Sequence, residues 1–188
     1  MKYIVCYTLL FFSLFINAQE QKTDYALNTY QKVNRGMTVL TTWAASNMII
    51  GATQIGSDQW HYHRANMLWN TVNLGLGLAG IYQSKRIKEI DDVNDLVKKQ
   101  RKLEKTFIIN SGLDLIYMAG GVVLHRNSNQ ELAQTGSSLI LQGGFLLLFD
   151  TMMYFTIKKE RKETVKSVPQ LGLTMIDWKP GVRFCLPL

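Results

Sequence analysis

The sequence predicts an all-α fold: a four-helix transmembrane bundle with an N-terminal signal peptide and a short tail that is irregular or a β-hairpin. Four stretches carry almost no charge for about 20 residues, the length that a helix needs to cross a bilayer. Lys and Arg instead crowd the segments between and after these stretches. The expected spans are residues 36–55, 65–83, 106–125 and 134–157.

The N-terminal segment has the layout of a secretory signal peptide. Lys2 is followed by an apolar run over residues 3–16 and then by Asn17 and Ala18. One positive residue, an apolar core and a small residue before a polar stretch are typical of such a signal. We expect residues 1–18 to be removed and to direct the chain to the bacterial cytoplasmic membrane; an uncleaved anchor helix is the alternative.

The polar segments around the spans differ in character. Residues 19–35 are expected to form a short polar lead-in helix, and residues 84–105 a solvated helical linker in which both signs of charge mix. Residues 158–188 form a basic, partly irregular tail. Apolar residues alternate with polar or small ones on both sides of residues 177–181, which predicts a short β-hairpin turning there.

Each span carries its polar and small residues on one helical face. In the second span, Asn66, Asn70, Asn73, Gly77 and Gly80 follow at steps of four and three residues. We expect these faces to point inward, because amide side chains in a bilayer hydrogen-bond across helices. A polar interior also accounts for a mean hydropathy of -0.02, which is low for four spans. The predicted intramembrane layer contains Asn47, Asn70, Asn73, Asn110, Asp114, Tyr117, Gln142 and Asp150.

Asp114 and Asp150 are the two carboxylates inside the expected spans. Asp114 is nine residues from Lys105 and Asp150 eight from Lys158, which places both roughly 12–14 Å from the charged end of the bundle. An ionisable residue within a span is a functional hypothesis by default. The pair either locks the bundle through hydrogen bonds or forms part of a proton- or cation-coupled conduit.

The three histidines are expected on the opposite side from the basic segments. His61 and His63 lie in the first hairpin loop, and His125 ends the third span. Three histidines suit a metal or haem site. The neighbouring Trp60 and Tyr62 fit equally well the aromatic belt of a membrane boundary. We therefore assign no metal and no cofactor, and keep the histidines as candidates for a metal- or haem-binding alternative.

No pattern of catalytic residues is present. The glycines near residue 77 lie within a helical pattern rather than a phosphate-binding loop, and Ser, His, Cys and Asp show no spacing that suggests nucleophilic catalysis. The net charge of +7 flanks the spans and has no nucleic-acid-binding motif. We expect no enzyme and no nucleic-acid partner. The expected partners are the lipid bilayer and either a second copy or another membrane protein.

Four sequence runs, among them YHRANMLWNTVNLGLG, LEKTFIINSGLDLIYMAGG and GSSLILQGGFLLLFDTMMY, together resemble a family of small bacterial four-span proteins, a domain of unknown function. The resemblance covers residues 30–157 and includes the motifs WNTVN, NSGLD and LQGGFLLLFD. It implies the fold and the membrane location, and no activity. The sequence thus predicts a non-enzymatic structural, accessory or ligand-binding membrane bundle.

The topology signals disagree. Lys and Arg number 18 in residues 19–35, 84–105 and 158–188, against two in the hairpin tips. The positive-inside rule places the basic end in the cytoplasm, whereas a signal peptide places it outside. A soluble exported bundle removes the conflict, but the third and fourth spans are apolar around most of their circumference.

Overall fold

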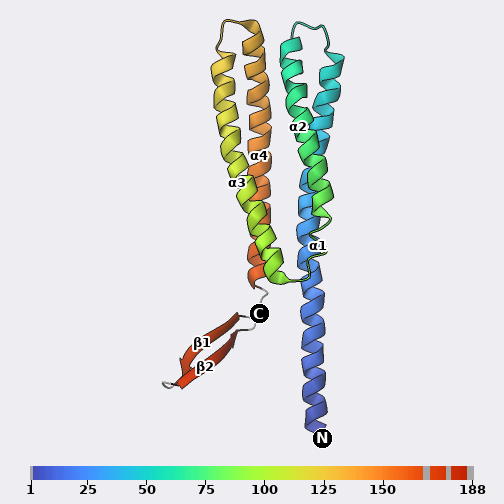
Figure 1. The fold of residues 1–188 in the computed structure, drawn as a ribbon, viewed down its shortest axis with the longest axis vertical. Helices are drawn as coiled ribbons and strands as arrows, with labels where there is room; N and C mark the ends of the chain where they lie inside the picture. The colour runs from blue at the N-terminus through green and yellow to red at the C-terminus, as the bar shows by residue number, and fades with distance from the viewer. Residues whose placement is uncertain (1, 167–169, 177–178, 186–188) are drawn as a thin grey trace.

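A computed structural model describes the backbone of residues 2–166, 170–176 and 179–185, and the side chains of residues 24–166. The described residues form four long helices and one two-stranded sheet (Figure 1). The helices are α1 (Lys2–Thr53), α2 (Trp60–Ser84), α3 (Val93–His125) and α4 (Gln130–Lys166). They pair as two antiparallel hairpins, α1 with α2 and α3 with α4.

Both hairpin tips lie at the same end of the bundle, at the top of Figure 1. The first tip turns at Gly56, whose φ of 81° is easily reached only without a side chain. The second tip uses Asn129, whose side chain accepts a 2.9 Å hydrogen bond from the Glu131 amide at the start of α4. The tips also touch, since Gln134 donates a 2.7 Å hydrogen bond to the carbonyl of Asp58.

Helix α4 is the centre of the bundle. It packs against α3 along its length and also against α1 and α2, whereas α1 and α3 barely meet. Glycines allow the closest approach: a Cβ on Gly136 would lie 2.5 Å from the carbonyl oxygen of Gly121. The chain therefore stacks its second hairpin onto the first through α4 and leaves α3 at the edge.

The helix boundaries differ from the sequence predictions at several places. α2 begins at Trp60, so His61 and His63 lie in this helix and not in the hairpin loop, and α4 continues beyond the expected span to Lys166. α1 runs without a break from Lys2, so the apolar leader, the lead-in and the first expected span form one helix. The predicted 84–105 linker helix is wrong in part: residues 85–92 make turns, and α3 begins at Val93. Asp92 caps it, since its side chain accepts a 3.0 Å bond from the Asn94 amide.

The 84–105 segment is also not free in solvent. Ile87 and Leu96 are each 1% exposed and join a core with Ala26, Val33 and Ile157. We call this part of the bundle the charged extension; it comprises residues 24–35, 85–105 and 158–166. It has the polarity of a water-soluble bundle, with apolar side chains inside and most charges outside.

Buried polar contacts hold the charged extension together. Gln100 is fully buried and donates to Thr29 at 2.9 Å and Thr164 at 3.1 Å. Glu160, 2% exposed, pairs with Lys32. Glu104 pairs with Arg161 through two hydrogen bonds of 2.5 and 3.2 Å, which raise the pKa of the guanidinium. These contacts connect α1, α3 and α4 at one end.

After α4 the chain forms an antiparallel hairpin of β1 (Gln170–Ile176) and β2 (Lys179–Cys185). Its register pairs Leu171 with Phe184 and Leu173 with Val182. The predicted turn begins at residues 177 and 178, which lie outside the described residues.

Among the described residues, α3 and α4 are long and apolar enough to cross a membrane. α1 and α2 do not meet the same criterion over their described residues, and their inward faces carry the amide side chains described next.

Candidate functional site: a buried amide network

Gln142 on α4 connects three helices. Its side-chain amide donates to the Asn66 oxygen on α2, and its oxygen lies 3.3 Å from both the Asn73 amide on α2 and the Trp43 indole nitrogen on α1. Gln142 itself is 2% exposed. One buried side chain therefore accepts hydrogen bonds from both helices of the other hairpin and donates one to α2.

The asparagines of α2 extend this network. Asn66 donates a 2.9 Å bond to the Asn47 oxygen on α1, and Asn70 donates to the Asn66 carbonyl at 2.7 Å. Asn47 in turn donates to the Trp43 carbonyl at 2.9 Å. The Asn70 oxygen is buried and has no hydrogen-bond partner among the described residues. The network thus keeps an unused acceptor in the interior.

Asp114 and Asp150 form a second polar pair between α3 and α4. They are 3% and 5% exposed, their carboxyl groups interact directly, and Asn110 interacts with Asp150. Hydroxyls lie nearby in sequence, with Ser111 3.4 Å from Thr151 across the two helices. One Asp114 oxygen has no hydrogen-bond partner among the described residues. Two ionised carboxylates in such a place would repel each other strongly.

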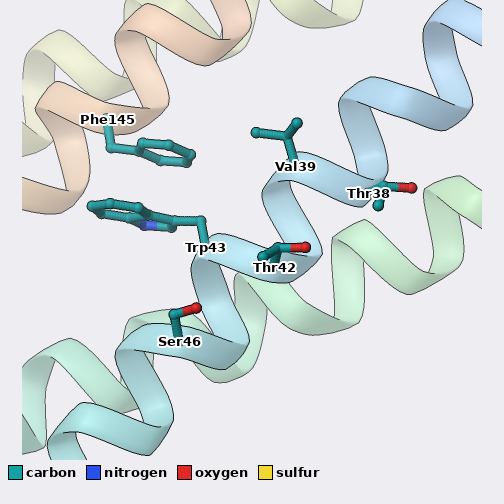
Figure 2. A pocket seen from close by; sticks show the side chains of 6 residues that line it. All are labelled: Thr38, Val39, Thr42, Trp43, Ser46 and Phe145. Atoms are coloured by element: carbon teal, nitrogen blue, oxygen red, sulfur yellow. The ribbon is translucent and has the colours of Figure 1, made fainter.

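A stack of aromatic rings lies between the level of Gln142 and the level of Asp150. The rings of Trp43 on α1 and Phe145 on α4 lie face to face (Figure 2), and their centres are 4.0 Å apart. Phe149 continues the stack at 6.2 Å and meets Phe107 of α3 edge-on at 6.4 Å. The stack fills the bundle between the two polar groups with apolar rings.

An open groove runs along the outer side of this stack (Figure 2). It has a volume of about 370 Å³ and lies between α1 and α4. Its lining is Thr38, Val39, Thr42, Trp43, Ser46 and Phe145. The lining combines three hydroxyl groups, from Thr38, Thr42 and Ser46, with the Val39 side chain and two aromatic rings.

The structure brings together most of the polar layer expected from sequence, in two groups. Asn47, Asn70, Asn73 and Gln142 belong to the amide network, and Asn110, Asp114 and Asp150 to the carboxyl pair. Tyr117 belongs to neither: it is 37% exposed and packs against the Trp69 ring at 5.0 Å. Trp43 and Asn66 also belong to the network but are not among the residues of the predicted layer, although Asn66 was expected on the inward face of the second span. Asn66 shares the helical stripe of Asn70 and Asn73, and that spacing was the signal for it.

The histidines do not assemble into a ligand set. His61 Nδ1 is 3.4 Å from Glu131, which also pairs with Arg64 at 2.9 Å. His125 bonds instead to the Ser137 hydroxyl at 2.8 Å. Within the described part of the chain, no three His, Cys, Asp or Glu side chains converge. The polar contacts at the tips join the two hairpins.

These features define a class: a helical bundle whose inward faces carry amides and carboxyls. The chain belongs to a family of unknown function, DUF6992, whose family model matches residues 39–151, more than half of its length. The matched region includes the whole amide network and both carboxyls. Neither a curated protein nor a solved structure matches the chain.

Proposed function

We propose that this chain is a non-enzymatic integral protein of the bacterial cytoplasmic membrane whose four helices all cross the bilayer. Residues 1–18 serve as its signal peptide, cleaved after Ala18. The amide network holds the two hairpins in one arrangement, and the bundle acts as a structural, accessory or ligand-binding component.

The observation that carries this proposal is the reversed polarity of residues 36–83 and 106–157. Their interior contains the amide network and the carboxyl pair, whereas large apolar side chains point outward with 48–69% of their surface exposed. These include Ile49, Ile50, Leu68, Val72, Leu76, Leu78, Ile108, Ile109, Leu115, Ile116, Leu148, Met152 and Phe155. A soluble monomer rarely exposes an apolar patch of more than a few hundred Å². Lipid covers such a surface without cost.

The reversed polarity also supports spans in α1 and α2. Hydropathy averages every face of a helix, but lipid meets only the outer one. On α2 the buried residues are Asn66, Asn70, Asn73, Gly77 and Ser84, while Leu68, Val72 and Leu76 are each more than half exposed. The low average of α2 therefore comes from its inward face.

Membrane extraction tests the proposal. The full chain, expressed in bacteria, should remain in the membrane pellet after washing with alkaline carbonate and should need detergent for release. A mature N-terminus at Gln19, read by intact-mass measurement, is expected from signal cleavage. Release by carbonate alone would show that the bundle is not integral, and a chain that retains residues 1–18 would contradict cleavage.

A second candidate function is a proton- or cation-coupled conduit through the carboxyl pair. Its support is the contact between Asp114 and Asp150 at buried positions, with one Asp114 oxygen unpartnered among the described residues. In sealed liposomes that contain the protein, an imposed ion gradient should dissipate faster than in empty liposomes. Asp150→Asn and Asp114→Asn should each remove the difference, and the tip variant Asp58→Asn should not. Equal fluxes with and without protein would end this candidate.

A further inference from the structure

The positive charge of this protein gathers at one end. Residues 19–35, 84–105 and 158–188 contain 18 of the 21 Lys and Arg but only 10 of the 14 Asp and Glu, which leaves an excess of eight positive charges. The tips, residues 56–64 and 126–133, contain two of each and are neutral overall. The end opposite the tips is therefore attractive to an anionic surface, and the tips are not.

Six exposed or half-exposed cations lie where the apolar surface ends, and we call them the basic collar: Arg35, Lys85, Arg86, Lys105, Lys158 and Lys159. Contacts of neighbouring residues place the six cations at a common level, and the pair of Lys32 on α1 with Glu160 on α4 relates the two hairpins. Ser84 bonds to Asn34 at 3.3 Å, next to Lys85 and Arg35. Glu104 pairs with Arg161. Glu104 is next to Lys105, and Arg161 follows Lys158 and Lys159 by three and two residues. The collar thus surrounds the bundle at the boundary between its apolar section and the charged extension.

The collar cations have no ion-pair partner among residues 24–166, and the same holds for several other cations of the charged extension, such as Lys99 and Lys166; the collar is distinguished by its place beside the apolar section. In the extension, Lys32, Lys98 and Arg161 are paired with Glu160, Asp95 and Glu104. The buried acids at this level, Glu104 and Glu160, already form ion pairs with Arg161 and Lys32. The collar charges are therefore available to an outside anion.

Tyrosines accompany two of the collar cations. The Arg86 guanidinium lies 6.0 Å from the centre of the Tyr82 ring, and the Lys158 ammonium lies 5.0 Å from the centre of the Tyr154 ring. Tyr82 is 65% exposed. Tyrosine collects at the head-group level of bilayers, because its ring is apolar and its hydroxyl polar. A tyrosine with a cation beside it suits a lipid head group better than bulk water.

We propose that the basic collar binds the phosphate groups of anionic phospholipids. This inference rests on the proposed membrane location. The site combines a ring of cations without ion-pair partners among residues 24–166, the exposed Tyr82, the partly buried Tyr154 and an adjoining apolar surface. This combination matches a phosphate group above an acyl chain. A nucleic acid or an acidic protein would require the cations without the apolar surface. Each Lys or Arg beside an anionic leaflet strengthens binding by about fivefold.

The test is a competition between lipids. Full-length protein in mild detergent is given equal amounts of phosphatidylglycerol and phosphatidylcholine, and the retained lipids are counted by native mass spectrometry. The wild type should retain the anionic lipid preferentially. The triple variant Lys85→Gln, Arg86→Gln, Lys105→Gln should lose that preference by on the order of tenfold or more.

A matched variant controls for net charge. Lys98→Gln, Lys99→Gln, Lys166→Gln removes the same charge from the charged extension, roughly 10 Å beyond the collar, and should keep the preference. Circular dichroism should show equal helix content in all three proteins. Equal retention of both lipids by the wild type would overturn the proposal, as would equal losses in the two variants or tighter binding to an oligonucleotide. Carbonate extraction tests the membrane location separately.

Discussion

At the scale of single residues, Gln142 is the side chain that joins the two hairpins. We expect Gln142→Ala to lower the free energy of unfolding by about 1–3 kcal/mol, because Asn66, Asn73 and Trp43 each lose a partner in a buried place. The measurement is an equilibrium unfolding titration with sodium dodecyl sulfate in mixed micelles. The neighbouring change Leu141→Ala is the control, since Leu141 is 40% exposed. A larger loss from Leu141→Ala than from Gln142→Ala would contradict the role of the network.

A second prediction at this scale concerns the Lys32–Glu160 pair. Glu160 is almost fully buried, but the Lys32 side chain is 38% exposed, so Lys32→Ala leaves a buried carboxylate without its partner and should destabilise more than an exposed pair would. A double-mutant cycle with Lys32→Ala and Glu160→Ala should give a coupling energy of about 0.5–3 kcal/mol. The same cycle on the exposed Lys98–Asp95 pair should give less. Additive effects at Lys32 and Glu160 would mean that the contact contributes nothing to stability.

At the scale of helices, the closeness of α3 and α4 depends on glycine. A Cβ on Gly136 would lie 2.3 Å from the His125 nitrogen and 2.5 Å from the Gly121 oxygen, both backbone atoms that cannot move aside. We expect Gly136→Ala to separate the hairpin and to cost about 1–3 kcal/mol. Gly144→Ala meets nothing within 4 Å on the same helix. It should be neutral or stabilising by up to about 1 kcal/mol, because alanine favours helix. Thermal unfolding in detergent distinguishes the two, and similar midpoints would contradict the close packing.

Whether the buried face of a helix could be predicted from sequence depended on how clearly the residues of that face differ from their neighbours. The polar stripe of α2 was readable because Asn66, Asn70 and Asn73 recur at helical spacing in an otherwise apolar run. The burial of the 84–105 segment was missed, although Leu96, Leu103 and Phe107 recur at steps of seven and four. The many charged residues of this segment obscured its apolar face. The residues against which that face packs, Ala26 and Val33, lie some 70 residues away in the sequence.

The partners within the candidate site could not be predicted for a different reason. Inward-facing amides follow from the pattern of one helix, but the pairing of Gln142 with Asn66 requires that α4 lie against α2. Sequence does not determine which helices are neighbours when four of them are connected by short tips and one turn. The central place of α4 and the edge position of α3 therefore came only from the structure, and so did the separation of Tyr117 from the carboxyl pair.

At the scale of the whole molecule, the arrangement predicts which positions share a side of the membrane. Both tips lie at one end and are bonded to each other through Gln134 and Asp58, while the 85–92 turn lies at the other end. In a background with Cys6→Ser and Cys185→Ser, single cysteines are introduced by Gln59→Cys, Ser128→Cys and Asp91→Cys. In sealed vesicles of one orientation, an impermeant maleimide should label the first two variants together and the third only from the opposite side.

The labelled side also decides between the two topology signals. If Asp91→Cys reacts from outside the cell, the signal peptide determines the orientation and the basic collar faces the outer leaflet. If it reacts from the cytoplasm, the 18 Lys and Arg of the basic end determine it, and the collar faces the inner leaflet. Labelling of Gln59→Cys and Ser128→Cys from different sides would contradict the paired tips. Labelling of all three from both sides would mean a bundle that does not cross the membrane, and its exposed apolar faces would then have to be covered by protein rather than by lipid.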